Sequence, residues 1–398
     1  MESIKEIYKI GHGPSSSHTM GPQNAALKFV KDNLEAAAFK ITLYGSLAAT
    51  GKGHLTDKAI KNVFAPYRKP LTLIWESQTF LPPHPNGIKF EALDGNGKAV
   101  KEWTTFSIGG GNLSDTGKLE PKAKWYDQSS MAHILQWCRQ NGTTFWEYVV
   151  LHEDKDIFDY LSEVWKVMKT AVEHGLETEG VIPGGLKLPR KAASYFVKAQ
   201  GYQGTMQRRS HVFAYALAVA EENASGGLIV TAPTCGSCGV IPAVLYLNHM
   251  HYGVSDKRII RALATAGLIG NIIKTNASIS GAEVGCQGEI GSACAMASAA
   301  AVQLFGGSVG QIEYAASMGM EHFLGLTCDP VNGLVQVPCI ERNAFAAGRA
   351  IDANMYALLS DGYHLISFDT VVEAMKRTGH DLPRLYKETA EGGLAALM

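Results

Sequence analysis

Three of the seven cysteines stand in loop-like stretches beside acidic or polar residues. Cys286 lies in SGAEVGCQGEIGS, Cys328 in LGLTCDPVNG and Cys339 in LVQVPCIERN. Thiolates bind zinc and iron–sulfur clusters, but the spacing here matches neither a zinc finger nor a ferredoxin run. The three residues are therefore candidate ligands of a metal or cluster, with small buried side chains as the alternative.

A second cysteine pattern is the C-x-x-C pair of Cys235 and Cys238, in TAPTCGSCGVIPAVLYL. Such a pair can be a redox dithiol, part of a metal site, or two small buried residues. A redox dithiol usually follows a strand in a βαβ unit, whereas the surroundings here read as helical. Cys138 and Cys294 lie within helical patterns, where a buried thiol is the simplest interpretation.

Near the N-terminus, GPSSSHTMGP places Ser15, Ser16, Ser17, His18 and Thr19 directly before a helix that begins near Pro22. Hydroxyl groups and unpaired backbone N–H groups at a helix start favour an anion such as a carboxylate or phosphate. The alternative is a simple helix cap, which needs only one of these hydroxyls.

Two histidines are candidate general bases. His54 lies between glycines in TGKGHLTD, and His84 lies in the proline-flanked FLPPHPNG. Imidazole titrates near neutral pH, so it can accept a proton from a substrate. Taken alone, each histidine is more often a surface or core residue than a catalytic base.

The elements around the serines and histidines alternate between short apolar runs and turn signals. FKITLYGSLA and PLTLIWES are typical of strands, GPQNAALKFVKDNL of a helix, and Asp94–Lys98 of a hairpin turn. We therefore predict an α+β domain over residues 1–125.

The cysteines stand in a region that predicts one helix after another. Apolar residues recur at helical spacing from Ile157 to Leu176, and the later helical segments are rich in Ala, Ser and Gly. This pattern indicates an all-α domain over residues 126–398. The predicted fold class is a multidomain α+β protein with an α+β domain first and an all-α domain second.

Composition limits the classes of partner. The chain of 398 residues has 36 Lys plus Arg against 37 Asp plus Glu, a net charge of −1, so no electrostatic argument favours nucleic acid or an anionic membrane. Two segments, 223–255 and 290–312, carry no formal charge, and each is long enough to span a membrane. Their Pro, Gly and other small residues favour buried helices instead. MESIKEIYKIGHG has no apolar signal core, and seven is an odd number of cysteines, so we expect a cytoplasmic protein.

Taken together, several motifs resemble the bacterial iron–sulfur L-serine dehydratases. They are GPSSSHTMGP, LYGSLAATGKGH, HPNG, GLKLPRKAA, NASISGAEVGCQGE and GMEHFLGLTCDPVNGLVQVPCIERNA, in family order over nearly the whole chain. The resemblance implies an N-terminal α+β domain, a helical second domain, and a [4Fe–4S] cluster held by Cys286, Cys328 and Cys339. It also implies a small amino-acid substrate and a homodimer.

The same resemblance implies a reaction, the conversion of L-serine to pyruvate and ammonia. Three thiolates leave one iron open, and that iron would act as a Lewis acid on the substrate hydroxyl. The Ser15–Thr19 segment would hold the substrate carboxylate, and His54 or His84 would take the α-proton, with His54 preferred. Lys274, Asn276 and Ser278 in IKTNASIS are further candidate substrate contacts, with capping or packing as the alternative.

The chain departs from the family pattern at three places. Only 29 residues, Leu55 to Pro83, separate the two histidines, whereas many relatives have a much longer segment there. Some relatives end in a cysteine that reaches the open iron, while this sequence ends GGLAALM. Relatives often have PTNGAAG where this chain has PTCGSCG, so we interpret Cys235 and Cys238 as substitutions near the cluster that could form a disulfide on oxidation.

Three other functions remain open from the sequence. A related cluster enzyme would act on L-cysteine or L-threonine, and small side-chain differences would decide between these substrates. A thiol–disulfide oxidoreductase would use Cys235 and Cys238. A non-catalytic amino-acid-binding module would tolerate replacement of Cys286, Cys328 and Cys339.

Overall fold

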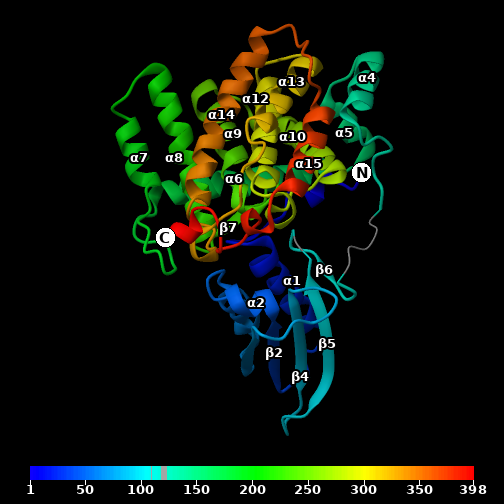
Figure 1. Ribbon diagram of the computed structural model, residues 1–398, viewed down its shortest axis with the longest axis vertical. Helices are drawn as coiled ribbons and strands as arrows, with labels where there is room; N and C mark the ends of the chain where they lie inside the picture. Colours follow the sequence, from blue (N-terminus) through cyan, green and yellow to red (C-terminus); the bar gives the residue numbers. More distant parts are fainter. Residues whose placement is uncertain (109, 118–122) are drawn as a thin grey trace. The chain divides into compact units, whose positions relative to one another are not determined.

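The chain folds into two compact units (Figure 1), seen in a computed structural model that describes residues 1–108, 110–117 and 123–398. The sheet unit comprises Gly11–Lys122. The helical unit comprises Ala123–Met398 together with the first ten residues, Met1–Ile10. The serines and histidines of interest therefore belong to one unit and the cysteines to the other.

The sheet unit is built on five strands in the order β3-β2-β4-β5-β6. β2 runs parallel to β3, and the other neighbours are antiparallel. The predicted turn at Asp94–Lys98 is present, because the Asp94 backbone N–H donates to the Lys98 carbonyl at 2.9 Å between β4 and β5. The bounds of these five strands are β2 (Ala38–Tyr44), β3 (Leu71–Glu76), β4 (Gly87–Leu93), β5 (Ala99–Ser107) and β6 (Leu113–Ser114), while β1 (Ile10–His12) lies outside this sheet and pairs with β7 (Leu228–Val230).

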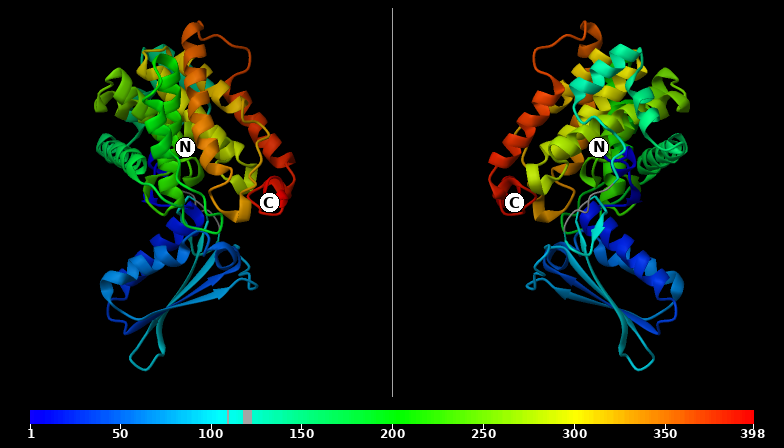
Figure 2. Two further views of the ribbon diagram at one scale, coloured as in Figure 1. Left: turned by 90° about the vertical axis from the view of Figure 1, so that its left-hand side faces the viewer. Right: turned by 90° about the vertical axis from the view of Figure 1, so that its right-hand side faces the viewer.

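Helices α1 (Gly21–Asp32) and α3 (Thr56–Phe64) pack on one face of this sheet, and α2 (Gly45–Thr50) follows β2 (Figure 2). The core between helix and sheet is aromatic, with the Phe29 and Phe90 rings 5.2 Å apart. The predicted strand at 39–48 is too long. Gly45 ends it with φ +53°, where a Cβ would lie 2.5 Å from the Pro85 carbonyl oxygen, so the chain turns into α2 there.

The helical unit contains one short strand, β7 (Leu228–Val230), and otherwise helices. The predicted helix at 157–176 is present as α6. The helix bounds are α4 (Met131–Asn141), α5 (Phe145–His152), α6 (Ile157–Glu177), α7 (Ala192–Ala199), α8 (Gly204–Ala224), α9 (Val240–Tyr252), α10 (Asp256–Asn276), α11 (Gly281–Val284), α12 (Ser292–Leu304), α13 (Val309–Glu321), α14 (Cys339–Leu359) and α15 (Phe368–Asp381).

Small residues let these helices approach closely. Nearly every residue of α12 is buried, against α9, α10, α13 and α14. A Cβ on Gly319 of α13 would lie 2.9 Å from the Ala295 Cα, so that contact requires glycine. The two charge-free segments contain the largely buried helices α9 and α12, as predicted, although the first segment also contains β7. None of the described helices is long and apolar enough to cross a membrane.

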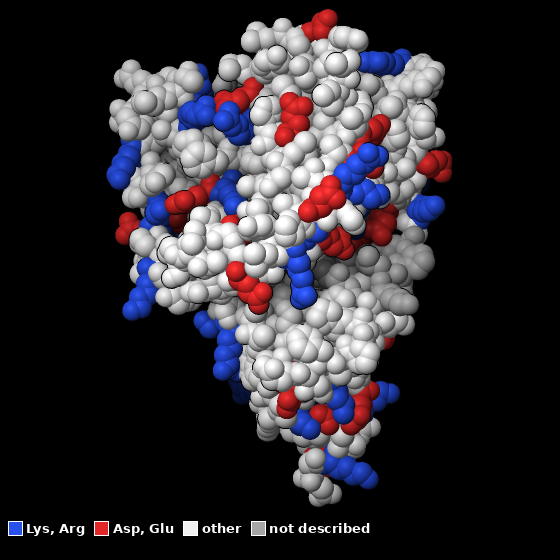
Figure 3. Space-filling view, in the orientation of Figure 1, with Lys and Arg blue, Asp and Glu red and all other residues white. Residues whose placement is uncertain are grey.

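The predicted fold class is confirmed, since an α+β unit with a small sheet is joined to a helical unit. Acidic and basic side chains are intermixed on the face drawn in Figure 3, in keeping with a net charge of −1. What positions chemistry in this fold is the set of loops at the ends of α11, α12 and α14, and the start of α1.

Candidate functional site

Cys286 stands at a sharp turn that leads into α12. The preceding Gly285 has φ +78°, and a Cβ there would lie 2.8 Å from the Leu326 carbonyl oxygen. The Gln287 N–H donates to that same oxygen at 3.3 Å, and its side-chain Oε1 accepts from the Gly325 N–H at 3.0 Å. These contacts fix the Cys286 turn to the segment that carries Cys328.

The backbone of Cys328 is paired on both sides with the C-terminal segment. Its N–H donates to the Tyr386 carbonyl at 2.8 Å, and its carbonyl accepts from the Glu388 N–H at 2.7 Å. Cys339 is the first residue of α14. Cys286 and Cys339 thus stand where a loop meets a helical turn, and Cys328 forms an isolated β-bridge with Lys387, so the backbones of all three predicted ligands are restricted.

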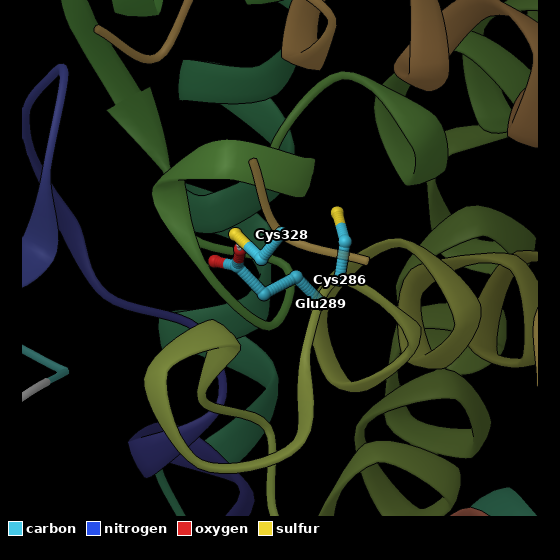
Figure 4. A group of neighbouring side chains, drawn as sticks. All are labelled: Cys286, Glu289 and Cys328. Carbon is cyan, nitrogen blue, oxygen red and sulfur yellow. Dashed lines mark hydrogen bonds between the residues drawn. The ribbon is translucent and has the colours of Figure 1, made fainter. Parts of the chain in front are cut away.

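The side chains of Cys286, Glu289 and Cys328 converge (Figure 4). One potential ligand atom from each lies within 4.8 Å of the others, and the Cys328 Sγ is 3.9 Å from Glu289 Oε2. Gly281 leaves room beside them, because a Cβ there would lie 2.9 Å from Glu289 Oε2 and 3.0 Å from the Cys328 Sγ. These residues form a cysteine-rich group able to hold a metal ion.

Electrostatics connect Cys339 to this group. Burial and the charges of Cys286 and Glu289 raise the pKa of the Cys339 thiol. The pKa of Cys328 is raised mainly by a hydrogen bond with Cys286 and also by burial. Burial raises the pKa of Glu289. When these three thiols and the carboxyl group ionise, their negative charges repel one another. A bound cation would therefore stabilise the ionised forms.

Arg342 supplies part of that positive charge. It lies one turn into α14 and forms a hydrogen bond with Cys286, whose charge, set against burial, raises the Arg342 pKa. Its guanidinium also donates to the Thr327 carbonyl at 2.7 Å and pairs with Asp329 at 3.1 Å, on both sides of Cys328. Arg342 therefore links the segments of all three cysteines.

An iron–sulfur cluster fits this donor set. The predicted ligands are thiols, the soft donors that such clusters take, and Gly281 keeps the space beside Cys328 free of a side chain. The three cysteines are brought into one electrostatic neighbourhood from segments 53 residues apart in sequence, Cys286 to Cys339.

Cys235 and Cys238 lie in a tight turn attached to α14. Asn343 donates to the Gly236 carbonyl at 2.7 Å and accepts from the Gly239 N–H at 2.8 Å. Both thiols are buried, with 2% and 0% of their surfaces exposed, and burial raises both pKa values. The charge of Glu289 also acts on Cys235, so this turn lies near the metal-binding group without belonging to it.

In the sheet unit, His18 and His54 lie against each other with ring centroids 4.7 Å apart. Both ring nitrogens of His18 meet hydroxyl groups, Nδ1 with Ser17 Oγ at 2.9 Å and Nε2 with Ser46 Oγ at 3.0 Å. Burial, with the nearby charge of His54, lowers the pKa of His18 to about 3. His18 is therefore a neutral ring fully engaged in hydrogen bonds.

His54 and His84 differ in which nitrogen is free. A carbonyl oxygen can only accept, so the contact of 3.1 Å to the Thr50 carbonyl assigns the proton of neutral His54 to Nδ1 and leaves a lone pair on Nε2. His84 Nδ1 instead accepts from the Asn86 N–H at 3.1 Å, which places its proton on Nε2. Burial lowers both pKa values.

The predicted anion segment forms a π-helical turn, Ser16–Met20, that continues into α1. Two of its hydroxyls serve the backbone: Ser15 Oγ accepts from the His18 N–H at 3.1 Å, and Thr19 Oγ1 donates to the His54 carbonyl at 2.8 Å. Ser16 and Ser17 are partly exposed. The hydrogen bond from Thr19 fixes the His54 backbone to this turn.

The three further candidates belong to the helical unit and already have partners in the chain. Lys274 pairs with Glu2 at 2.7 Å. Asn276 donates to the Ser129 and Ile272 carbonyls at 2.7 and 2.9 Å. Ser278 donates to Glu283. Each of these contacts also serves to hold the start of the chain or the loop after α10.

Sequence reasoning missed Glu289, Arg342 and Asn343. Glu289 follows Cys286 by three residues and Arg342 follows Cys339 by three, the spacing that places side chains on one helical face. That spacing was the available signal, although it becomes informative only once both cysteines are known to start helical turns.

The fold and the site define a two-unit protein in which a helical unit carries a cysteine-rich group able to hold a metal ion and a small α+β unit carries neutral histidines and hydroxyls. The model of the serine dehydratase alpha chain matches residues 52–395, and that of the serine dehydratase beta chain matches residues 3–69. The chain belongs to the serine dehydratase family.

Curated relatives agree along the full length. An L-serine dehydratase of Streptomyces coelicolor is 40% identical over 99% of this chain and 98% of its own. One of Haemophilus influenzae is 41% identical over 99% of both chains, and L-serine dehydratase 1 of Escherichia coli is 40% identical over 99% of both. The Streptomyces alignment has 448 positions, so at least 50 of them stand opposite gaps in this chain of 398 residues.

Proposed function

We propose that this chain is an L-serine ammonia-lyase that converts L-serine to pyruvate and ammonia. The observation that carries the proposal is the convergence of Cys286, Glu289 and Cys328 in a chain about 40% identical to L-serine dehydratases along its whole length. Loss of water from serine gives aminoacrylate, which tautomerises to an imine and is hydrolysed to the two products.

Two steps of this reaction are chemically difficult. The α-proton of serine is weakly acidic, and hydroxide is a poor leaving group. Cys286, Cys328 and Cys339 would hold a [4Fe–4S] cluster, which when bound supplies a Lewis acid for the departing hydroxyl group. Arg342 and the backbone contacts of Cys328 keep the thiolates in place, and no pyridoxal Schiff base is needed.

His54 is the proposed general base, in preference to His84. The Nε2 lone pair of His54 can accept the α-proton, because Nδ1–H is held by the Thr50 carbonyl at 3.1 Å. Burial lowers the His54 pKa, so the ring is neutral at pH 7 and ready to accept a proton. His84 presents Nε2–H instead, which suits it to donate a hydrogen bond to the substrate.

The substrate carboxylate is assigned to the segment Ser15–Thr19. Ser15 and Thr19 shape the turn, which leaves the partly exposed Ser16 and Ser17 hydroxyls to donate to the carboxylate, while His18 orients Ser17. Lys274, Asn276 and Ser278 stay predicted substrate contacts. We further propose a cytoplasmic homodimer, which light scattering during size-exclusion chromatography would test.

The decisive experiment is an anaerobic purification of the full chain. Iron, sulfide and the visible spectrum are measured, and pyruvate formation from L-serine is compared with 2-oxoacid formation from L-threonine and L-cysteine. We expect a coloured protein with four irons per chain and the highest kcat/KM for L-serine. Full activity in a colourless, iron-free protein would overturn the cluster assignment, and a preference for threonine or cysteine would replace the substrate.

A further inference from the structure

Glu289 is the acidic member of the metal-binding group and has no role in the proposed reaction so far. It lies in the π-helical turn Gln287–Gly291 that opens α12, three residues after Cys286. One oxygen of its carboxylate lies within 4.8 Å of the thiol sulfurs of both Cys286 and Cys328. In Figure 4 the carboxylate is drawn beside the Cys328 sulfur. An acidic side chain among candidate thiolate ligands adds charge repulsion, which requires a reason.

The surroundings orient the Glu289 carboxyl group through hydrogen bonds and through the space that nearby glycines leave. Thr234 donates a hydrogen bond to it. Two glycines make room for it, since a Cβ on Gly236 would lie 3.2 Å from Oε1 and a Cβ on Gly281 would lie 2.9 Å from Oε2. The cation whose charge acts on it, Arg342, forms its ion pair with Asp329 at 3.1 Å. The carboxylate thus faces the thiols of Cys286 and Cys328, where a bound metal cation would stabilise its ionised form.

A carboxylate oxygen is a competent iron ligand, and it is a harder donor than a thiolate. Three cysteines hold three corners of a four-iron cluster and leave one iron without a protein thiolate. An oxygen ligand at that corner would exchange more readily for another oxygen donor than a thiolate would. Glu289 lies beside two of the three predicted thiolate ligands, and its carboxylate has the chemistry of such an oxygen ligand.

We propose that Glu289 is the fourth protein ligand of the cluster, with its carboxylate on the iron that no cysteine holds in the substrate-free protein. The inference rests on the proposed function, because it presupposes the cluster. Binding of the substrate would exchange the Glu289 oxygen for an oxygen of the substrate, and no electron is transferred in that exchange. Glu289 would then close the site when serine is absent.

The test reads the ligand directly in the full-length holoprotein. Protein labelled with ¹³C at the glutamate side-chain carboxyl group is purified anaerobically, its cluster is reduced, and ¹³C couplings are measured by pulsed electron–nuclear double resonance. We expect a through-bond ¹³C coupling in the wild type that disappears in Glu289→Gln. Adding L-serine to the wild type should also remove it.

A matched variant separates ligation from general charge effects. Glu341 lies two residues after Cys339, but its carboxylate is exposed and pairs with Lys191 at 3.1 Å. Glu341→Gln makes the same chemical change beside the third cysteine and should keep the coupling. In Glu289→Gln, one iron per cluster should be lost to ferricyanide about tenfold faster, the scale on which loss of a supporting group lowers metal affinity.

The outcomes are distinct. A wild-type cluster without a ¹³C coupling would overturn the assignment of Glu289 while leaving the proposed function intact, and a rise in KM for serine in Glu289→Gln would then assign the carboxylate to the substrate ammonium group. A wild-type protein that binds no cluster would overturn the proposed function itself. Because the main reading is made on the wild type, poor folding of a variant does not affect it.

Discussion

Burial has opposite effects on the two groups of functional side chains, yet the result is the same. In the helical unit, burial raises the pKa values of Cys339 and Glu289, and in the sheet unit it lowers those of His18 and His54. Both groups are thereby driven toward their uncharged forms. For histidine the uncharged form is the one that accepts a proton, whereas a thiol must lose its proton before it can bind a metal.

This contrast shows that the two units differ in whether their functional side chains need a bound cation to reach the working form. The sheet unit holds its histidines in working form through hydrogen bonds within the chain, such as those of His18 with Ser17 and Ser46. The helical unit collects acidic groups whose ionised forms need a cation. Variants in one unit should therefore affect iron content, and variants in the other should affect turnover alone.

The largest effect is expected for Cys328→Ser. Loss of one thiolate should remove both iron and serine turnover, because the remaining donors no longer complete the set of three cysteines. Iron content, the visible spectrum and pyruvate formation measure this. Cys138→Ser, the same change at a buried cysteine of α4, is the control and should retain iron. Normal turnover in Cys328→Ser would remove that residue from the site.

The next largest effect separates turnover from iron. His54→Gln should lower kcat by about 10²- to 10⁴-fold, the usual contribution of a general base, with iron content unchanged. His84→Gln, the companion variant, should mainly raise KM. Because burial lowers the His54 pKa, the apparent pKa of the acid limb in the wild-type profile of kcat/KM against pH should lie below the ordinary histidine value of 6.5. An equal loss in kcat for both variants would contradict the assignment of the base.

A smaller effect concerns stability against pH. The pKa of His18 is about 3 in the folded protein against 6.5 ordinarily, so the unfolded chain binds the extra proton. The stability contributed by neutral His18 is complete above pH 6.5 and is lost as the pH falls toward 3, at up to about 1.4 kcal/mol per pH unit.

Hydrogen exchange of the amides in α1 and β2 between pH 7 and pH 5 would measure this loss in the full chain. His18→Gln should flatten the dependence, while His380→Gln, at an exposed position of α15, should leave it unchanged. A wild-type dependence as flat as that of His18→Gln would show that folding does not lower the pKa of His18.

The smallest effect is expected for the double variant Cys235→Asn, Cys238→Ala. Neither residue belongs to the metal-binding group, so iron content and serine turnover should change at most a few-fold. The informative measurement is the rate of inactivation by oxygen. A changed rate would support the predicted disulfide near the cluster, and an unchanged rate would reduce both cysteines to packing.

Much of this organisation could be predicted from local sequence patterns. Alternating apolar residues located β3, helical spacing located α6, and Gly- or Pro-rich surroundings singled out Cys286, Cys328 and Cys339. Contacts distant in sequence could not be predicted in this way. The end of β2 at Gly45 depends on the Pro85 carbonyl 40 residues later, and the protonated nitrogen of His54 depends on how its ring meets Thr50.

Glu289 and Arg342 show the same limit at the site. Each is an ordinary charged residue in the sequence and acquires a role only when separate loops meet. A spacing of three residues from a cysteine indicates that two side chains share a helical face. Which residues of other loops those side chains contact is decided by the tertiary fold.

The first turn of α14 combines a predicted cluster ligand with two cross-links. Cys339 begins it, Arg342 joins it to the Cys328 loop, and Asn343 joins it to the turn of Cys235 and Cys238. Fraying of this turn would break the Arg342 and Asn343 contacts together, so both loops would lose a contact at the same moment. The lifetime of the metal centre would then be set by how often a single helix end opens, and stabilising that end would prolong activity in air without altering any group that touches the substrate.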